Sequence, residues 1–259
     1  MSIAIELEKV SKSFIGEKSR NIDVLSNISV SIESSSFVSI IGPSGCGKST
    51  ILNLLAGIIP PTSGRIKVHG QILDKIRPEL ISVAFQEPAL YPWKNIRENI
   101  EFPMFLRHIQ KDERKETVKK YIKLVGLTGY ERHLPNELSG GMQQRVALAR
   151  ALVMETPILL MDEPFGALDE QTRLILADEL TRIWMQTKKT IVLVTHSLIE
   201  AAYLSDIIVV LTNKPSQIQE VIKVDVPRPR VFESEDLSKI RSRLWSILSR
   251  EAMRVFEKV

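Results

Sequence analysis

The sequence contains one cysteine and no long apolar run. Cys46 has no second cysteine to pair with, which excludes an internal disulfide and leaves no basis for a cysteine-based metal site. No stretch reaches the roughly 17 to 25 apolar residues that cross a bilayer. Glu6, Glu8 and Lys9 interrupt any signal-peptide pattern near the start. We therefore expect a protein that stays in the cytosol.

The sequence also lacks a concentration of basic charge. The formal net charge of the 259 residues is +4, and residues 223–259 hold nine of the 35 Lys and Arg against six of the 31 Asp and Glu. Residues 1–222 are therefore nearly neutral. Aromatic residues make up only 6% of the chain, too few for a stacking surface along a nucleic acid. We expect no nucleic acid partner, while the 44% of hydrophobic residues supply a substantial core.

What the sequence does contain is a series of short runs rich in β-branched residues. They are apolar on both faces, as is typical of parallel strands that helices cover. Helical periodicity lies between several runs, for example over residues 170–187, where one stripe holds Leu176, Leu180, Ile183 and Trp184. The pattern predicts an α/β fold with a mainly parallel sheet. The predicted strands are residues 37–41, 81–85, 158–161, 191–195 and 207–211.

Other regions depart from this pattern. The first thirty-odd residues and residues 64–70 alternate apolar and polar side chains, which predicts antiparallel strands. Residues 95–135 hold Lys, Glu and Leu at helical spacing, which indicates a helical insertion. Residues 226–230, "VPRPR", form a proline-punctuated linker. The amphipathic helix predicted after this linker has an apolar face of Leu237, Ile240, Leu244, Ile247 and Leu248.

The stretch "GPSGCGKST" fits the pattern of a phosphate-binding loop, because it follows a predicted strand and opens a helical pattern. Its glycines let backbone N–H groups converge on phosphate oxygens, and the helix N-terminus adds positive potential. Lys48 would neutralise the β- and γ-phosphates, Ser49 would bind Mg²⁺, and Thr50 would reach the α-phosphate. The residues predicted to bind the nucleotide are Gly42, Pro43, Ser44, Gly45, Cys46, Gly47, Lys48, Ser49 and Thr50.

Cys46 occupies a variable position of this loop. We interpret it as a small space-filling residue rather than a nucleophile, because the sequence implies no partner base nearby. A helix N-terminus lowers the pKa of a thiol. Alkylation of Cys46 is therefore predicted to block nucleotide binding.

Two acids follow the predicted strand at residues 158–161. Asp162 would place a carboxylate beside the Mg²⁺ held by Ser49. Glu163, one residue further, could then polarise the attacking water. Pro164 fixes the exit from the strand, which argues against two solvated loop charges.

A set of motifs, in this order and spacing, closely resembles the ATP-binding cassette ATPases. The motifs are "GPSGCGKST", "FQEP", "LSGGMQQR", "LLMDEP", "GALD" and "VTH". In "FQEPALYPW", "DEPFGALDEQTR" and "VPRPR" the chain resembles the nitrate/sulfonate/taurine-type importer ATPases. The resemblance implies a P-loop NTPase core over residues 1–215 with a helical subdomain inserted at about 87–150. Residues 216–259 would form a C-terminal extension with the amphipathic helix.

The resemblance implies roles for further residues. Gln86 matches the glutamine that contacts Mg²⁺ and water and relays nucleotide state to a membrane partner, and His196 matches the switch histidine near the γ-phosphate. Asp169 matches the acid that communicates across a dimer, and Phe14 matches the aromatic residue that stacks on adenine. Ser197 departs from the acid that importers often carry there. The implied catalytic residues are Lys48, Gln86, Glu163 and His196, and the implied Mg²⁺ ligands are Ser49, Gln86 and Asp162.

A second glycine turn, "LSGGMQQR" at residues 138–145, also opens a helix. Ser139 can cap it, but Met142 stands where a capping box needs Glu or Gln. Gly140 and Gly141 cost a helix up to about 1 kcal/mol each relative to alanine, so they suit close approach of an anion to the helix N-terminus. The resemblance implies a head-to-tail dimer in which Ser139, Gly140 and Gly141 of one copy cover the γ-phosphate of ATP bound by the other.

The resemblance thus implies an ATPase that uses ATP and Mg²⁺, pairs with a second copy and drives a separate transmembrane permease. A solute-binding protein would deliver an anionic or small organic solute, and the ATPase would lie at the cytoplasmic face of the membrane. Residues 91–102 are either the docking surface for the permease or ordinary core. Two alternatives stay open: a soluble cassette ATPase acting on ribosomes, DNA or Fe–S assembly, and a non-hydrolysing nucleotide sensor, which Glu163 and His196 disfavour.

Overall fold

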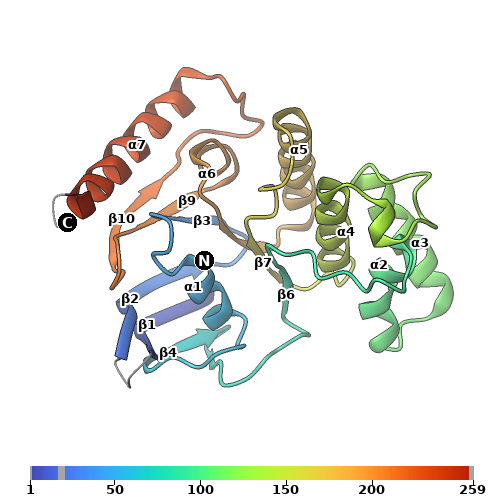
Figure 1. The fold of residues 1–259 in the computed structure, drawn as a ribbon, viewed down its shortest axis with the longest axis horizontal. Helices are drawn as coiled ribbons and strands as arrows, with labels where there is room; N and C mark the ends of the chain where they lie inside the picture. Colours follow the sequence, from blue (N-terminus) through green and yellow to red (C-terminus); the bar gives the residue numbers. More distant parts are fainter. Residues whose placement is uncertain (1, 17–20, 257–259) are drawn as a thin grey trace. The chain divides into compact units, whose positions relative to one another are not determined.

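The protein folds into two compact units (Figure 1). One unit consists of Met1–Arg77 together with Lys188–Val259, and the other of Pro78–Thr187. The structure, a computed structural model, describes residues 2–16 and 21–256. Each unit contains both strands and helices.

An antiparallel sheet occupies the start of the first unit. Its alternating sequence buries apolar side chains such as Ile5, Leu7 and Val10 and turns others outward, as expected for a sheet with one wetter face. Register shifts interrupt the pairing between its two longest strands, and such bulges bend and twist a strand. In spatial order the strands are β2 (Asn21–Glu33), β1 (Ile3–Ile15), β4 (Ser63–Val68) and β5 (Gln71–Ile72).

A second group of strands in the first unit is mainly parallel. β3 (Phe37–Ile41) pairs in parallel with both β8 (Thr190–Val194) and β9 (Ile207–Leu211). Every residue of β3 and β8 is buried, which explains why their sequences are apolar on both faces. β10 (Ile218–Lys223) pairs with β9 in the antiparallel sense.

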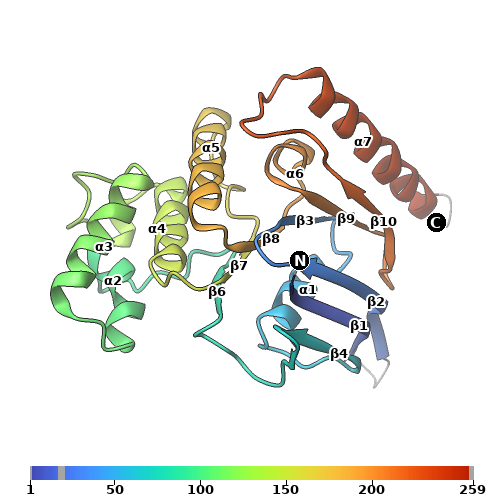
Figure 2. The same cartoon turned by 180° about the vertical axis from the view of Figure 1, so that it is seen from behind.

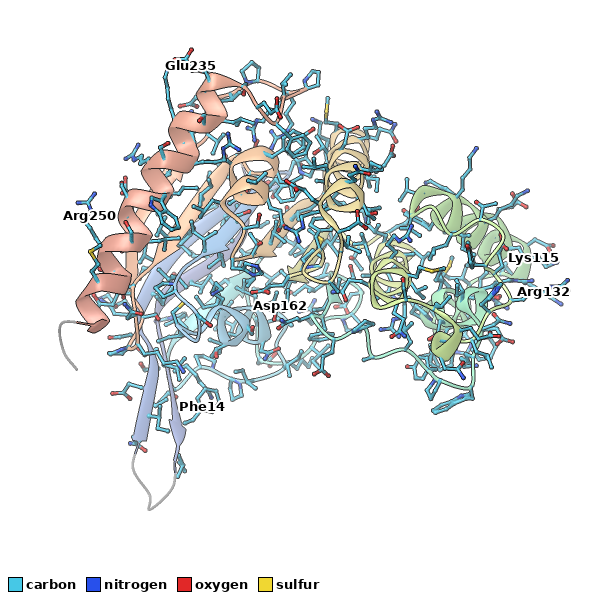
Figure 3. The ribbon with its side chains drawn as sticks, turned by 45° about the horizontal axis from the view of Figure 1, so that its top comes forward. Phe14, Lys115, Arg132, Asp162, Glu235 and Arg250 are labelled. Atoms are coloured by element: carbon cyan, nitrogen blue, oxygen red, sulfur yellow. The ribbon has the colours of Figure 1, made fainter. Side chains whose placement is uncertain are left out.

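Three helices accompany these strands. α1 (Lys48–Leu55) follows β3, α6 (Leu198–Leu204) follows β8, and α7 (Glu235–Phe256) follows β10. Figure 1 shows α7 alongside β10 and α6, and Figure 3 labels Glu235 and Arg250 towards its two ends. The predicted apolar face of this helix is confirmed: Leu244 and Ile247 belong to a buried core cluster, Ile240 and Leu248 pack against it, and Leu237 is buried.

The second unit combines two strands with several helices. β6 (Ile81–Ala84) and β7 (Ile158–Asp162) are parallel. Between them in sequence lie α2 (Ile96–Leu106), α3 (Lys111–Leu124) and α4 (Gly140–Leu152), which contact one another (Figure 2). α2 and α3 lie within the helical region predicted at residues 95–135, and α4 follows it.

Local signals explain where helices of the second unit begin. A capping box starts α2, since Asn95 Oδ1 accepts the Glu98 N–H and Glu98 Oε2 accepts the Asn95 N–H. A one-turn 3₁₀ helix, Pro135–Glu137, precedes α4. α5 (Glu170–Thr187) has the predicted bounds and buries its predicted stripe of Leu176, Leu180, Ile183 and Trp184.

The predicted α/β fold, with mainly parallel strands and an N-terminal antiparallel sheet, is confirmed. The second unit is wider than the helical subdomain predicted at about 87–150, because it includes β6, β7 and α5. β10 and α7, which lie in the predicted C-terminal extension, belong to the first unit. None of the helices in the described part of the chain has the length and hydrophobicity to span a membrane.

Candidate functional site

Residues 42–50 join β3 to α1 through a turn that requires glycine. Gly45 and Gly47 have φ angles of 73° and 110°, where other residues are strained. A Cβ on Gly47 would lie only 2.7 Å from Val24 Cγ1. Gly47 is the N-cap of α1, and no side chain of the described residues caps this end. The first N–H groups of α1 are thus available to an anion.

Lys48 places a positive charge over this turn. Its side chain is 8% exposed, and Nζ donates to the carbonyl oxygens of Gly42 and Pro43 at 2.9 and 3.1 Å. Carbonyl dipoles satisfy the ammonium as a donor but do not cancel its charge. The charge therefore remains available for phosphate oxygens at the same turn, where Ser49 is exposed and Thr50 is partly exposed.

Cys46 is buried beneath the turn, and the predicted lowering of its thiol pKa is wrong. The residue is 1% exposed, and Sγ would lie 2.8 Å from a Cβ on Gly42. Burial raises the pKa of the Cys46 thiol, and the nearby Lys48 charge offsets this only in part. The space-filling interpretation agrees with this position. Alkylation of the thiol would first require the turn to open.

Phe14 lies near the end of β1 and is labelled in Figure 3. It is 40% exposed, so part of its ring is accessible to a stacking base. The Lys12 ammonium lies 5.1 Å from the ring centroid and is itself held by the Pro60 carbonyl at 2.7 Å. A cation over an aromatic ring attracts its π electrons and restricts its movement.

His196 leaves the same sheet edge as the phosphate-binding turn. β3 and β8 are parallel, and Ile40 lies opposite Val194, so the segments after these strands emerge side by side. Thr195 Oγ1 donates to Glu200 Oε2 at 2.6 Å and fixes the turn that carries the exposed His196.

Ser197, the departure from the acid found in many importers, has a structural task in this turn. Its Oγ accepts the Glu200 N–H at 3.3 Å and caps α6. Its own N–H donates to Thr195 Oγ1 at 3.0 Å. The substitution therefore retains a well-defined turn after His196.

In the second unit, the predicted Mg²⁺-binding and catalytic residues follow β6 and β7. Because these strands are parallel with Ala84 opposite Met161, Gln86 and Glu163 lie at the same end of the pair. Asp162, labelled in Figure 3, ends β7 and is 6% exposed. Glu163 has a φ of 44°, a conformation that costs a non-glycine residue about 1–3 kcal/mol and is concentrated at functional sites.

Gln144 ties these two segments together, and no role was predicted for it. Its side chain is 5% exposed. Nε2 donates to the Gln86 carbonyl at 3.0 Å and lies 3.5 Å from the Glu163 carbonyl. The NH₂ group of an amide has two protons and can serve both acceptors. The signal was present in "LSGGMQQR", but only the fold identifies the acceptors.

The two glycines at the start of α4 have different surroundings. Ser139 Oγ accepts the Met142 N–H at 3.3 Å and caps the helix, although the capping box is incomplete. A Cβ on Gly141 would lie 3.0 Å from Leu168 Cδ2. A Cβ on Gly140 would meet no heavy atom of the described residues within 4 Å, apart from its chain neighbours and the backbone of its own helix. Gly140 is also the first residue of α4 and has no positive φ. Neither conformation nor packing explains why Gly140 is glycine.

The predicted ligand atoms suit Mg²⁺. Ser49, Gln86 and Asp162 offer hydroxyl, amide and carboxylate oxygens, and Mg²⁺ prefers oxygen ligands while retaining several waters. Within the described residues, no group of three or more His, Cys, Asp or Glu is placed to hold a metal, as a structural zinc site would need. When bound, Mg²⁺ would neutralise charge on the phosphates.

A comparison with known protein families matches the part of the chain that contains both glycine-rich turns. Residues 25–166 match the family described as ABC transporter. The chain belongs to the ABC transporter family. ATP-binding cassettes of this family hydrolyse ATP, so this ABC protein is an ATPase.

Two relatives of this ABC ATPase are similar over nearly their whole length. An uncharacterized ABC transporter ATP-binding protein of Methanocaldococcus jannaschii is 43% identical over 254 residues, which cover 98% of this chain and 94% of the relative. An aliphatic sulfonates import ATP-binding protein of Bacillus cereus is 42% identical over 243 residues, covering 93% and 94%.

A solved ABC structure is similar in fold. It is the dimeric post-hydrolysis state of an ATP-binding cassette bound to ADP and Pi. The TM-score is 0.78 and the sequence identity is 32%, over 86% of this chain and 100% of the other. The nucleotide-bound form of that cassette is therefore a dimer.

Proposed function

We propose that this ABC ATPase powers the import of a small solute through a separate permease, as one of two copies at the cytoplasmic face of the membrane. The 42% identity with an aliphatic sulfonates import ATP-binding protein supports this role. A solute-binding protein would deliver the solute. The proposed solute class is small organic anions, with aliphatic sulfonates as its first members to test.

The residues of the first unit would bind the nucleotide. Phe14 would stack on adenine, and the turn at residues 42–50 would surround the phosphates. Lys48 would bind the β- and γ-phosphate oxygens with the ammonium that rests on loop carbonyls. His196 would contact the γ-phosphate from the turn after β8.

The second unit would supply the base and two ligands of the metal. Glu163 would accept a proton from the water that attacks the γ-phosphorus, while the bond to the ADP oxygen breaks. Asp162 and Gln86 would bind Mg²⁺ together with Ser49. Gln144 supports this arrangement because it bonds to the backbone of both the Gln86 and the Glu163 segments.

The glycine at position 140 is the main observation that supports the proposed dimer. Nothing in the described part of its own chain requires a glycine there. A helix N-terminus without a side chain lets an anion approach the backbone N–H groups closely. The γ-phosphate held by a second copy would meet this requirement, with Ser139 and Gly141 beside it. Asp169, which caps the Thr172 N–H at 2.9 Å, would face the partner copy.

The permease would dock on the segment around Trp93. Ile96 and Ile100 are buried, so part of residues 91–102 is core, but Trp93 is 72% exposed. The segment is held in place by Asn99, whose side chain accepts the Tyr91 N–H at 2.8 Å. A fixed, exposed tryptophan is typical of an interface anchor.

Dimerisation of Glu163→Gln tests the proposed ATP site. We expect this variant to bind ATP without hydrolysing it and to form a dimer at saturating Mg-ATP, measured by light scattering. Glu170→Gln, which removes an exposed carboxylate from the start of α5, is the matched control and should stay monomeric under turnover. A Glu163→Gln variant that remains monomeric with ATP would contradict the proposal.

Copurification tests whether a permease binds the ATPase through the segment around Trp93. We expect the ATPase to be captured with a polytopic membrane protein encoded beside it, and Trp93→Ala to abolish capture. Trp245→Ala, which alters a tryptophan that is 67% exposed on α7, should leave it intact. Equal capture of both variants would exclude the Trp93 segment as the docking surface for the permease. Copurification with ribosomes instead would favour a soluble ABC ATPase.

A further inference from the structure

A turn outside the ABC motifs contacts the phosphate-binding turn at residues 42–50. Residues 212–217 join β9 to β10, and Ser216 in this turn is 0% exposed. Ser216 Oγ donates to the Cys46 carbonyl, and Oγ also lies 3.0 Å from the Thr212 carbonyl. Cys46 is the middle residue of "GCG" in the phosphate-binding turn. A buried side chain 170 residues away in sequence therefore holds the backbone of that turn.

The orientation of the Cys46 carbonyl determines where the next N–H points. In a trans peptide the C=O and N–H groups point in opposite directions. The Cys46 carbonyl and the Gly47 N–H belong to one peptide, so drawing the carbonyl towards Ser216 directs the Gly47 N–H away from it. Rotation of this peptide changes ψ of Cys46 and φ of Gly47, and glycine on the Gly47 side offers little steric resistance to it.

The backbone of Ser216 reinforces the same contact. Its N–H donates to the Val24 carbonyl at 2.9 Å, and its carbonyl accepts the Ser26 N–H at 2.9 Å. Val24 is the residue that packs against Gly47, 2.7 Å from the position of an added Cβ. Ser216 thus fixes both the peptide before Gly47 and the surface on which Gly47 rests.

The turn that carries Ser216 is itself anchored. Thr212 and Gln217 close it, because the Thr212 N–H donates to the Gln217 carbonyl and the Gln217 N–H donates to Thr212 Oγ1, both at 3.0 Å. Asn213 Nδ2 donates to the Glu251 carbonyl of α7 at 2.8 Å. The Ser216 hydroxyl therefore projects from a restrained support.

We propose that Ser216 is a positioning residue for ATP binding, which directs the Gly47 N–H towards the phosphates by holding the Cys46 carbonyl. The inference rests on the proposed nucleotide site at residues 42–50. Ser216 itself touches no nucleotide. The Gly47 N–H would contact phosphate before and during hydrolysis alike, so loss of its orientation weakens ground-state and transition-state binding equally.

Ser216→Ala is the direct test. Loss of one hydrogen bond that orients a donor corresponds to about a threefold to tenfold rise in the Kd and KM for Mg-ATP, with kcat nearly unchanged. Binding is measured with a fluorescent ATP analogue and turnover by phosphate release. Ser205→Ala is the matched control, because Ser205 is also 0% exposed and donates to Ser39 Oγ inside β3 rather than to the turn.

The controls separate three outcomes. A Ser216→Ala variant that loses thermal stability as Ser205→Ala does, and keeps the wild-type KM, would assign Ser216 a structural role and overturn the inference. Unchanged ATP affinity in Lys48→Ala would instead reject the nucleotide site itself. If Ser216→Ala does not fold, Ser216→Cys in reducing buffer replaces the hydroxyl by a weaker donor, and an unchanged KM there overturns the inference.

Discussion

The two glycine-rich turns of this ABC ATPase look alike in sequence but use glycine for different reasons. At residues 42–50 the chain itself requires it, because Gly45 and Gly47 have positive φ and Gly47 packs on Val24. At the start of α4, Gly140 has ordinary helical geometry and open space around it. A glycine that its own fold does not need points to a ligand or partner from outside the chain.

The difference extends to how each helix begins. The N-cap of α1 is Gly47, which has no side chain, and the charge nearby comes from Lys48. The N-cap of α4 is Ser139, whose hydroxyl satisfies the Met142 N–H. One turn can bind an anion with a charged residue of its own, whereas the other offers mainly backbone and a hydroxyl. A shared phosphate would explain why the second turn needs no lysine.

Replacing Lys48 by alanine should have the largest effect. Removal of a preorganised charge at a transition state typically lowers kcat by about 100-fold or more. We expect a loss of this size in phosphate release, together with weaker ATP binding. Lys239→Ala, which removes an exposed lysine of α7, should match the wild type. Activity in Lys48→Ala within tenfold of the wild type would contradict the assigned role of the first turn.

Gly47→Ala should destabilise the fold more than Gly45→Ala. Both place Cβ in a left-handed conformation, which costs about 1 kcal/mol, but only Gly47→Ala also brings Cβ within 2.7 Å of Val24. We expect a difference of about 1–3 kcal/mol in the free energy of unfolding, measured by urea denaturation. Equal losses would show that packing does not dictate the first turn.

Gly140→Ala should weaken ATP-dependent dimerisation without lowering the stability of the monomer. Alanine at an unconstrained helical position stabilises by about 0.4–1 kcal/mol, so the monomer should be as stable as the wild type or more so. ATP binding by the monomer should be unchanged. We expect ATP-dependent dimerisation and hydrolysis to fall about tenfold, as loss of one close anion contact implies. A dimer of normal affinity would remove the reason for the second turn.

The buried thiol under the first turn should give the smallest effect, on the pH dependence of stability. The folded pKa of Cys46 is raised, so its contribution to stability is complete below the unfolded pKa of about 8.5 and is lost as pH rises through the folded value. Cys46→Ala should show a shallower fall in unfolding free energy as pH rises above about 8.5. If the free energy of unfolding changes with pH in the same way in the wild type and in Cys46→Ala, the thiol is not desolvated.

Much of the fold and the candidate site can be predicted because the relevant signals are local. Buried strands are continuous apolar runs, α5 has a complete helical stripe over residues 170–187, and the phosphate-binding turn has its glycines, lysine and hydroxyl in one stretch. Each feature depends on a few consecutive residues. Periodicity and turn chemistry are sufficient to find them.

Features that depend on distant residues could not be predicted. The raised pKa of Cys46 follows from burial under Gly42, and the sequence shows only a helix N-terminus that would lower it. The role of Gln144 depends on carbonyls 58 and 19 residues away. The asymmetry between Gly140 and Gly141 arises from Leu168, which is remote from "SGG" until the chain folds.

The exposure of Trp93 affects the steady-state amount of this protein in the cell. A large apolar side chain that is 72% exposed is suited to burial in a complex and is a liability outside one. If the permease docks on this segment as proposed, molecules made in excess of the permease would present that surface to chaperones and proteases. We expect the steady-state amount of the ATPase to follow the amount of permease, and Trp93→Ala to weaken that dependence.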